Sequence, residues 1–324
     1  MTRRCKEKRV SEQAGRKVEH EITVQAGAGE VYRLLAEVEN WPRLFPPSVY
    51  VEYLEREGNQ ERIQIWATAN GEAKNWTSRR ELDPEKLHIV FRQEVSAPPV
   101  AEMSGTWIME PRGERETRLR LLHEYRAIDD DPEGLAWIDR AVDQNSRSEL
   151  PSLKAGLEEA TRTAELTLSF VDSVQVDGSA KDLYSFVNDA DLWTERLPHV
   201  AKVNLTEDTP GLQVLRMETL TRDGAAHTTE SVRVCLPHRR IAYKQTTLPA
   251  LMTLHTGYWQ FDEGTDGVTT ASSQHTVVIN ADNITRILGP DAGVAQAKEF
   301  IREALGGNSR ATLGHAKEYA EARR

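Results

Sequence analysis

The sequence predicts an α+β protein of two tandem domains, each a curved antiparallel sheet of about seven strands wrapped around a long C-terminal helix. Three observations lead to this fold class. Residues 18–165 follow the order strand, two short helices, six strands and long helix. Residues 166–324 follow the same order. Landmark residues also recur between the two copies at a nearly constant spacing, which is typical of a duplicated domain.

The first copy begins with an expected strand at Val18–Val24 and a short helical segment at residues 28–37 that runs into Trp41-Pro42. Turns such as Asn70-Gly71 then separate segments rich in β-branched and aromatic residues, which we expect to be strands. These six strands are expected at residues 49–56, 61–68, 74–82, 87–95, 103–110 and 117–128.

A long helix is expected to close each copy. In the first copy it begins at Asp131-Pro132, because an acidic residue followed by proline suits a helix N-terminus. Pro151 lies within the helical pattern and predicts a kink or a break. The boundary between the copies falls near residues 163–167 and has no Gly/Ser linker. We therefore expect the copies to pack closely, through their long helices.

The repeat is visible as matched residues. Five landmarks recur 152 residues later: Tyr32 as Tyr184, Trp41 as Trp193, Gly105 as Gly257, Trp107 as Trp259, and His123 as His275. Ser78 and Arg80 recur as Ser231 and Arg233 after 153 residues, which places a one-residue slip in a loop. Asn145-Ser146-Arg147 returns as Asn308-Ser309-Arg310 after 163 residues. Such regular spacing indicates two copies of one domain.

The composition is that of a globular protein and excludes several classes of function. The chain has 324 residues, 39% of them hydrophobic and 28% charged, and no apolar run that could span a membrane. The formal net charge of −10 argues against nucleic-acid binding. Cys5 and Cys235 are the only cysteines, so we expect a reducing cytoplasm and no structural disulfide. Zinc-ligand spacing, a phosphate loop and a nucleophile elbow are missing, so we expect no metal and no cofactor.

Residues 1–17 form a basic segment with no apolar run behind it, so it does not have the pattern of a secretory signal. The composition of this segment predicts a flexible arm, because it has too few apolar residues to pack. The alternative is an arm that contacts an acidic partner.

The segment Trp76–Leu82 carries the main indication of function. Alternate residues of a strand share a face, so Trp76, Ser78, Arg80 and Leu82 lie together. An arginine on a largely apolar face is costly unless a partner neutralises it or the face lines a cavity. A sheet curled around one helix leaves a hollow between the two, which is the usual place for a hydrophobic ligand.

An ordered set of motifs covers nearly the whole chain after the first seventeen or so residues: Trp41-Pro42-x-Leu44-Phe45, Trp76-x-Ser78-x-Arg80, Gly105-x-Trp107 and Asn145-Ser146-Arg147. This set resembles the polyketide aromatase/cyclases, which are helix-grip (START-like) proteins of bacterial type II polyketide synthases. The duplication resembles their di-domain subclass.

The resemblance implies that a poly-β-ketone held on an acyl carrier protein enters the pocket. The enzyme would promote an aldol closure between carbons seven and twelve and then the loss of water. Some members of the family act on a chain that a ketoreductase has already reduced. The implied partners are the acyl carrier protein and other synthase components, without nucleic acid or membrane. The family's pocket residues carry over to Arg80, Ser78, Trp41, Phe45, Trp76 and Trp107.

Each of these residues has a second interpretation. Arg80 stays protonated, so it would hold a developing oxyanion, or else form a structural salt bridge with a residue such as Glu102 or Glu124. Ser78 would bind a second oxygen, or else be an ordinary hydrogen-bonded strand serine. The aromatic residues would bend the flexible substrate, or else be ordinary core.

His123 and Tyr125 share a face of the last strand of the first copy, where an imidazole would remove or relay the α-proton and Tyr125 is a candidate for substrate binding. A single histidine on an apolar face is nevertheless more often a hydrogen-bonded core residue. The second copy offers Arg233 and Ser231 as catalytic candidates and Trp193, His199 and Trp259 as substrate-binding candidates. It has Thr229 in place of Trp76. The sequence therefore leaves open which copy is catalytic and whether Arg233 points inward or outward.

A non-catalytic carrier of a lipid or polyketide is the main alternative, because it also explains a hollow without an obvious acid–base pair. A hydrolase is not supported, since the chain has no nucleophile–base signature. An acyl carrier protein is typically acidic, so docking on this acidic chain needs a local basic patch. The candidates for that patch are residues 1–17 and Arg239-Arg240.

Overall fold

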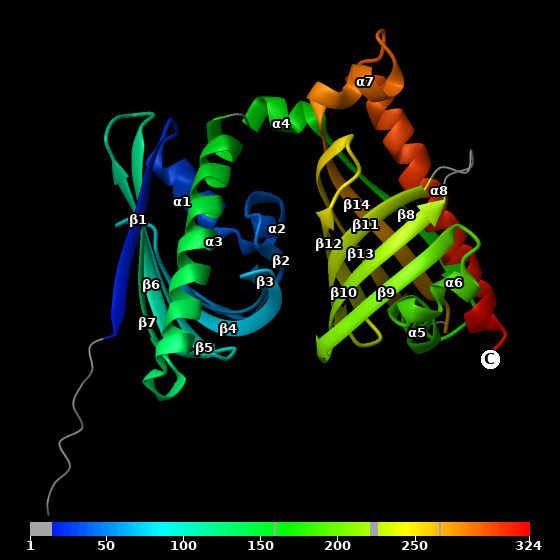
Figure 1. Ribbon diagram of the computed structural model, residues 1–324, viewed down its shortest axis with the longest axis horizontal. Helices are drawn as coiled ribbons and strands as arrows, with labels where there is room; N and C mark the ends of the chain where they lie inside the picture. Colours follow the sequence, from blue (N-terminus) through cyan, green and yellow to red (C-terminus); the bar gives the residue numbers. More distant parts are fainter. Residues whose placement is uncertain (1–14, 159, 221–225, 266) are drawn as a thin grey trace, which may run out of the picture.

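The computed structural model describes residues 15–158, 160–220, 226–265 and 267–324. These residues form two antiparallel sheets of seven strands, and each sheet is followed by a long helix that packs against it (Figure 1). The predicted fold class of two tandem helix-grip domains is confirmed. Residues 1–14, which make up most of the predicted arm and include Cys5, lie outside the described residues.

The first sheet has the strand order β1-β7-β6-β5-β4-β3-β2. Its strands are β1 (Arg16–Val24), β2 (Ser48–Glu57), β3 (Gln60–Ala69), β4 (Glu72–Asp83), β5 (His88–Val95), β6 (Val100–Pro111) and β7 (Thr117–Ala127). After β1 come α1 (Ala28–Ala36), η1 (Val38–Asn40) and α2 (Trp41–Leu44). After β7 come η2 (Ile128–Asp130) and the long helix α3 (Pro132–Glu158).

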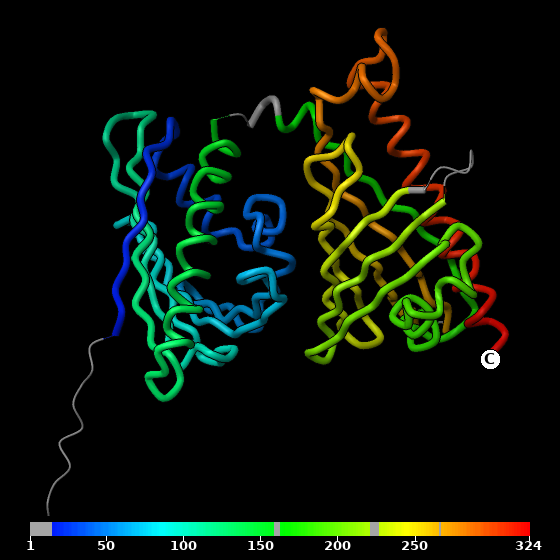
Figure 2. The backbone as a smooth tube through the Cα atoms, in the orientation of Figure 1, coloured from blue at the N-terminus to red at the C-terminus, as the bar shows by residue number. Residues whose placement is uncertain are grey.

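The second sheet repeats the order as β8-β14-β13-β12-β11-β10-β9. Its strands are β8 (Thr167–Val176), β9 (Val200–Thr209), β10 (Leu212–Leu220), β11 (Ala226–Leu236), β12 (Arg240–Thr247), β13 (Met252–Glu263) and β14 (Thr269–Ile279). Its helices are α5 (Ala180–Asn188), η3 (Ala190–Leu192), α6 (Trp193–Arg196), η4 (Ala281–Asn283), α7 (Ile284–Leu288) and α8 (Val294–Glu321). The short helix α4 (Ala160–Leu166) joins the two halves (Figure 2). None of the helices within the described ranges is long and apolar enough to cross a membrane.

A glycine at the same place in each sheet explains one of the repeated landmarks. A Cβ atom on Gly105 would lie 2.4 Å from the ring of Phe91 and 2.1 Å from the carbonyl oxygen of Leu122. A Cβ atom on Gly257 would lie 2.5 Å from the hydroxyl of Tyr243. Glycine is therefore required because an aromatic ring of the neighbouring strand lies across its backbone.

The helix α3 begins where the sequence predicts. Asp131 accepts a hydrogen bond from the backbone N–H of Gly134 at 2.7 Å, and Pro132 is the first helical residue. The helix then continues through Pro151, so the predicted break does not occur. Leu150 and Leu153 are buried on either side of the proline, and we infer that this packing offsets the hydrogen bond that proline cannot donate.

The two domains meet mainly through the outer face of the second sheet. Strands β10 to β13 contact β2, β4 and α2 of the first domain. Val49 of β2 shares one apolar cluster with Leu212, Val232, Val234 and Ala242. The expectation that the long helices form the contact is wrong, because the outer face of the second sheet is itself apolar and is buried against the first domain.

Arg239 and Arg240 belong to this interface. Arg239 forms an ion pair with Glu52 at 2.7 Å. Arg240 donates a hydrogen bond to the hydroxyl of Tyr50 at 3.1 Å, and its guanidinium lies 4.5 Å from the ring centre of Tyr258. This pair therefore does not form the free basic patch that the sequence suggested for carrier-protein docking.

Candidate active site

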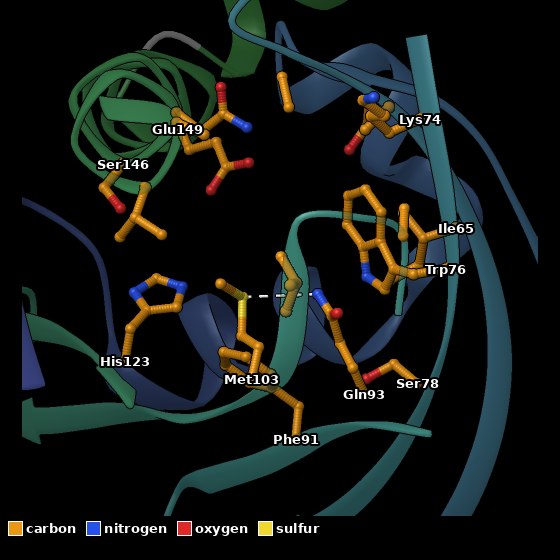
Figure 3. A pocket seen from close by; sticks show the side chains of 18 of the residues that line it. Ile65, Lys74, Trp76, Ser78, Phe91, Gln93, Met103, His123, Ser146 and Glu149 are labelled. Carbon is orange, nitrogen blue, oxygen red and sulfur yellow. Dashed lines mark hydrogen bonds between the residues drawn. The ribbon is translucent and has the colours of Figure 1, made fainter. Parts of the chain in front are cut away.

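A cavity lies between the first sheet and α3 (Figure 3). It has a volume of about 160 Å³, or about 1200 Å³ when all the space out to its open mouth is included. Strands β2 to β7, the end of α2 and one face of α3 contribute its walls. The cavity arises because the sheet curves around the helix without filling the space between them.

Aromatic side chains form much of the cavity wall. Trp41, Phe45, Trp76 and Trp107 all line it, as the family resemblance implied. The rings of Phe45 and Trp107 stack with centres 6.3 Å apart, and Trp41 meets Phe45 edge to face. Phe45 and Trp107 are also buried core residues. Wall and core are therefore the same side chains, and the two interpretations of the sequence do not exclude each other.

Arg80 lines the cavity and is 2% exposed. Its guanidinium forms an ion pair with Glu61, which lies directly opposite on β3, with Nη2 and Oε2 3.2 Å apart. Nη2 also donates to the carbonyl oxygen of Ala36 at 2.9 Å, and the cation lies over the ring of Trp41. Nε of Arg80 has no hydrogen-bond partner within the described part of the chain. It is a buried donor, so its hydrogen-bonding capacity is unused among these residues.

The ion-pair partners suggested for Arg80 are wrong. Glu102 lies near Arg126 and Glu124 near Lys17. Glu61 faces Arg80 because the β3–β4 hairpin places them in register, and the register depends on the turn geometry. Burial lowers the pKa of Arg80, and the negative charge of Glu61 opposes this fall.

Ser78 also lines the cavity, next to Gln93 in Figure 3. Its side chain is buried and donates a hydrogen bond to the carbonyl oxygen of Arg92 at 3.1 Å. The serine is therefore a satisfied strand residue. Its hydroxyl oxygen keeps acceptor capacity, because a hydroxyl has two lone pairs.

His123 on β7 and Glu149 on α3 point into the cavity from facing elements (Figure 3). Burial lowers the pKa of His123 to about 4, so the imidazole is neutral near pH 7. Its Nδ1 has no partner among the described residues. Burial raises the pKa of Glu149 to about 8, against the opposing charge of Lys244. The cavity thus combines a neutral imidazole with a mainly protonated carboxyl group, which is a set suited to proton transfer.

The sequence analysis did not identify Glu149, although a signal for it exists. Ile138, Val142, Ser146 and Glu149 recur at helical spacing and all line the cavity. A carboxyl group on an otherwise apolar helical stripe is the same kind of anomaly as an arginine on an apolar strand face. Several other residues line the cavity without having been predicted from the sequence: Lys74, Phe91, Gln93, Met103 and Asn145.

Tyr125 lies on the same strand as His123 but outside the cavity lining. It is buried, and its hydroxyl donates a hydrogen bond to the carboxylate of Asp139 on α3. Burial raises the pKa of Tyr125, and the carboxylate of Asp139 raises it further. The structure therefore gives Tyr125 a part in holding α3 against β7.

The second domain turns Arg233 inward, which answers the question that the sequence left open. Arg233 is 2% exposed and donates from Nη2 to the carbonyl oxygen of Val187 at 2.6 Å. Its guanidinium lies 5.2 Å from the ring centre of Trp193. The residue opposite on the neighbouring strand is Gln213, where the first domain has Glu61.

The other candidates of the second domain are dispersed. Trp193 and Trp259 belong to its hydrophobic core cluster. Ser231 is half-buried on β11, opposite Leu215. His199 is half-buried in the turn before β9, and burial lowers its pKa.

A hydrogen-bonded cluster occupies the second domain at positions that line the cavity in the first. Nδ1 of His275 lies 2.9 Å from both the hydroxyl of Tyr243 and Nε2 of His255. Nε2 of His275 is hydrogen-bonded to the hydroxyl of Ser309 at 2.6 Å. Burial lowers the pKa of His275 to about 4, and the positive charge of Arg302 lowers it further. Their counterparts in the first domain are His123, Phe91, Met103 and Ser146.

Comparison with known proteins agrees with this architecture. The family model described as "Polyketide cyclase / dehydrase and lipid transport" matches residues 15–158 and again residues 167–321. The chain is 51% identical to the granaticin polyketide synthase bifunctional cyclase/dehydratase of Streptomyces virginiae, over 91% of this chain and 97% of that protein. It is 44% identical to the actinorhodin polyketide synthase bifunctional cyclase/dehydratase of Streptomyces coelicolor, over 93% and 95%.

Two solved structures share the arrangement of both halves. The di-domain ARO/CYC BexL from the BE-7585A biosynthetic pathway has a TM-score of 0.85 and 66% identity, covering 95% of this chain and all of that one. The di-domain ARO/CYC StfQ from the steffimycin biosynthetic pathway also has a TM-score of 0.85, with 34% identity and coverage of 94% and 99%.

Proposed function

Because this chain belongs to the polyketide cyclase/dehydrase family, we propose that its first domain binds a poly-β-ketone, closes the first ring between carbons seven and twelve, and removes water. The observation that carries the proposal is the cavity, where a buried arginine, a neutral imidazole and a protonated carboxyl group meet aromatic walls. Relatives that cover nearly the whole chain are cyclase/dehydratases, so the chain is an enzyme that acts with a type II polyketide synthase.

Ring closure forms one carbon–carbon bond and returns the proton that it takes. Neutral His123 accepts a proton from carbon twelve, and the enolate attacks the carbonyl carbon at position seven. The imidazolium then gives its proton to the new alkoxide. Nε of Arg80 is the free donor that would hold the enolate oxygen. A donor aimed at developing charge in a water-poor site contributes roughly 3–4 kcal/mol to the barrier reduction.

Dehydration breaks the carbon–oxygen bond at carbon seven and removes the second proton from carbon twelve. The protonated carboxyl of Glu149 donates to the departing hydroxyl, which leaves as water, while His123 accepts the carbon-bound proton. Proton transfer from the imidazolium to the carboxylate restores both groups. A pKa of about 8 suits Glu149 to this task, because an acid works best when its pKa is close to the working pH.

The aromatic walls supply the regiochemistry in this proposal. A linear poly-β-ketone has many conformers, and only a bend that brings carbons seven and twelve together leads to this ring. Trp41, Phe45, Trp76 and Trp107 surround the space in which the bend would be held. Holding two reacting carbons in place replaces much of the entropic part of the barrier.

We propose in addition that the substrate arrives on an acyl carrier protein. The open mouth of the cavity and the relatives' place in polyketide synthases support this delivery. Residues 1–17 are the remaining basic candidate for docking, because Arg239-Arg240 is engaged between the domains. Titration of a purified carrier protein against the chain with and without residues 1–14 tests the arm. If the carrier protein binds both forms of the chain with equal affinity, the arm is excluded as the docking site.

The site itself is tested in a reconstituted minimal synthase. We expect Glu149→Gln to accumulate the closed ring that has not lost water, because Glu149 acts in dehydration. Arg80→Met combined with Glu61→Met should yield spontaneously cyclised shunt products, because Arg80 acts in ring closure. The double replacement leaves no unpaired buried charge, so it should destabilise the fold less than Arg80→Ala. Arg233→Met is the matched change in the second domain, and it should keep the normal ring pattern.

Circular dichroism confirms that each variant is folded. If the folded Glu149→Gln variant and the folded Arg80→Met, Glu61→Met variant both give normal products, the proposed active site is wrong. Loss of the pattern in Arg233→Met alone would move the chemistry to the second domain. If the wild-type protein binds a polyketide tightly but does not change the products, the alternative of a non-catalytic carrier is favoured.

A further inference from the structure

We propose that Lys244 of the second domain is a positioning residue of the first-domain cavity, so that the two domains form one composite site. The inference rests on the proposed function of that cavity. Lys244 lies on β12, where it is 7% exposed. Its neighbour Tyr243 points inward to the histidine cluster, so Lys244 points outward, toward the first domain.

The ammonium group of Lys244 holds the backbone of the cavity wall. Nζ donates to the carbonyl oxygen of Phe45 at 2.7 Å and to that of Ser48 at 3.0 Å. Both residues line the cavity, and the ring of Phe45 stacks on Trp107. The segment between them is Pro46-Pro47, which has no backbone N–H groups. The lysine therefore links the position of an aromatic wall residue to the second domain.

The surroundings make a lysine unexpected at this position. The nearby interface is built from apolar residues that include Val49 and Ala242. Burying an ammonium group costs several kcal/mol unless hydrogen bonds and charge compensate for it. Here the compensation comes from the two carbonyl oxygens of the cavity wall, which accept hydrogen bonds from the ammonium group. A charged group in this place is better explained by what it does to the cavity.

The same ammonium group affects the acid proposed for dehydration. The titratable or charged residues that line the cavity together with Glu149 are His123 from β7 and Lys74 and Arg80 from β4, and Lys244 acts on Glu149 from β12. Burial lowers the pKa of Lys244 to about 7, and the charge of Glu149 opposes this. The positive charge of Lys244 in turn holds the pKa of Glu149 down. Removing that charge should raise the pKa of Glu149.

A carboxyl-¹³C NMR titration of the full chain measures this effect directly. The Glu149 signal is assigned from its loss in Glu149→Gln. We expect Lys244→Met to move the titration midpoint of Glu149 up, because an opposite charge has been removed nearby. Lys244→Arg carries a permanent charge and should keep the midpoint at or below its original value. Lys202→Met, on the exposed part of β9, is the matched control and should change nothing.

Product analysis in the reconstituted synthase measures the positioning effect. Lys244→Met should lower the yield of the normal ring by about tenfold or more, since small displacements of a wall lose the reactive geometry. Lys244→Arg should restore part of that yield. Lys244→Gln keeps a donor without the charge, and it serves in place of Lys244→Met if the latter does not fold.

The outcomes separate this inference from the proposed function. An unchanged Glu149 midpoint in folded Lys244→Met or Lys244→Gln overturns the composite site, even if Glu149→Gln abolishes normal products. A shifted midpoint together with normal yield from Lys244→Met overturns the positioning role. A shifted midpoint and reduced yield, rescued by arginine, support it. Normal products from Glu149→Gln would instead count against the proposed function, while the shifted midpoint would still link the two domains.

Discussion

The interiors of the two domains differ although their backbones follow the same topology. In the first domain Phe91, Met103 and His123 border a cavity. In the second domain the matching residues Tyr243, His255 and His275 are hydrogen-bonded to one another. Two substitutions in this group, phenylalanine against tyrosine and methionine against histidine, accompany the change from cavity lining to a hydrogen-bonded cluster.

The buried arginines differ in the same way. Arg80 is paired with a carboxylate, Glu61, whereas Arg233 faces the amide of Gln213. The second domain also differs on its outside, where an apolar sheet face covers the first domain. The comparison teaches that the described cavity is lined by residues of the first domain, while the second domain contributes a contact to its wall through Lys244.

The largest expected effect comes from breaking the buried ion pair of the first domain. Glu61→Ala leaves the cation of Arg80 buried without its carboxylate and should lower the free energy of unfolding by about 3–5 kcal/mol. Gln213→Ala is the matched change in the second domain and should cost only about 1–3 kcal/mol, because no charge loses its counterion. Urea unfolding measures both. If both variants lose the same free energy of unfolding, the exchange of a carboxylate for an amide beside the arginine does not affect stability.

Exchanging the residues that distinguish the interiors gives the next largest effect. Tyr243→Phe with His255→Met removes two partners of His275 and should cost about 2 kcal/mol of stability, without changing the ring pattern. The reverse exchange, Phe91→Tyr with Met103→His, should narrow the first cavity and reduce product formation. Unfolding curves and product profiles of the two double variants test this. A lost ring pattern in the second-domain variant would contradict the division of roles.

A smaller effect concerns the pH dependence of stability. The pKa of His275 is about 4 in the folded chain against an ordinary value of 6.5, so between these pH values the unfolded chain binds more protons. Stability should therefore fall as the pH drops from 6.5 toward 4, by up to about 1.4 kcal/mol per pH unit for this group. His275→Gln should flatten that slope in urea unfolding measured at several pH values. An unchanged slope would mean that His275 is already protonated in the fold or that other groups dominate.

The smallest effect is expected at the rim of the domain interface. The ion pair between Arg239 and Glu52 is half-exposed on the arginine side, so Arg239→Ala should cost about 0.5 kcal/mol. Added salt should weaken this contribution further. Comparing urea unfolding of Arg239→Ala with that of Lys244→Met distinguishes an exposed interface charge from a buried one. If Arg239→Ala lowers the free energy of unfolding as much as Lys244→Met does, burial does not determine how much each charge contributes to stability.

Much of the fold could be read from local patterns. Strand alternation placed Trp76, Ser78 and Arg80 on one face, and the structure puts all three on the cavity wall. The spacing of matched residues indicated the duplication, and Asp131-Pro132 marked the start of α3. These features depend on residues close together in the chain or on exact repetition, so they can be predicted without knowledge of the tertiary structure.

The contacts that complete the site could not be read in this way. Glu61 meets Arg80 through a strand register, and Glu149 reaches the cavity from a helix that closes the fold much later in the chain. Pro151 was expected to kink or break that helix, and the helix continues through it without a break.

The sequence by itself determined the duplicated helix-grip fold, the family and the polar residues on the cavity face of β4, because these follow from periodicity and repetition. Only the tertiary structure decided which side chains border the first-domain cavity, which charge neutralises Arg80 and how the second sheet brings Lys244 to the wall. The physical reason is that volume, burial and ion pairing are properties of residues brought together from distant parts of the chain. A lysine on an exposed strand and one buried against two carbonyl oxygens have the same local sequence pattern.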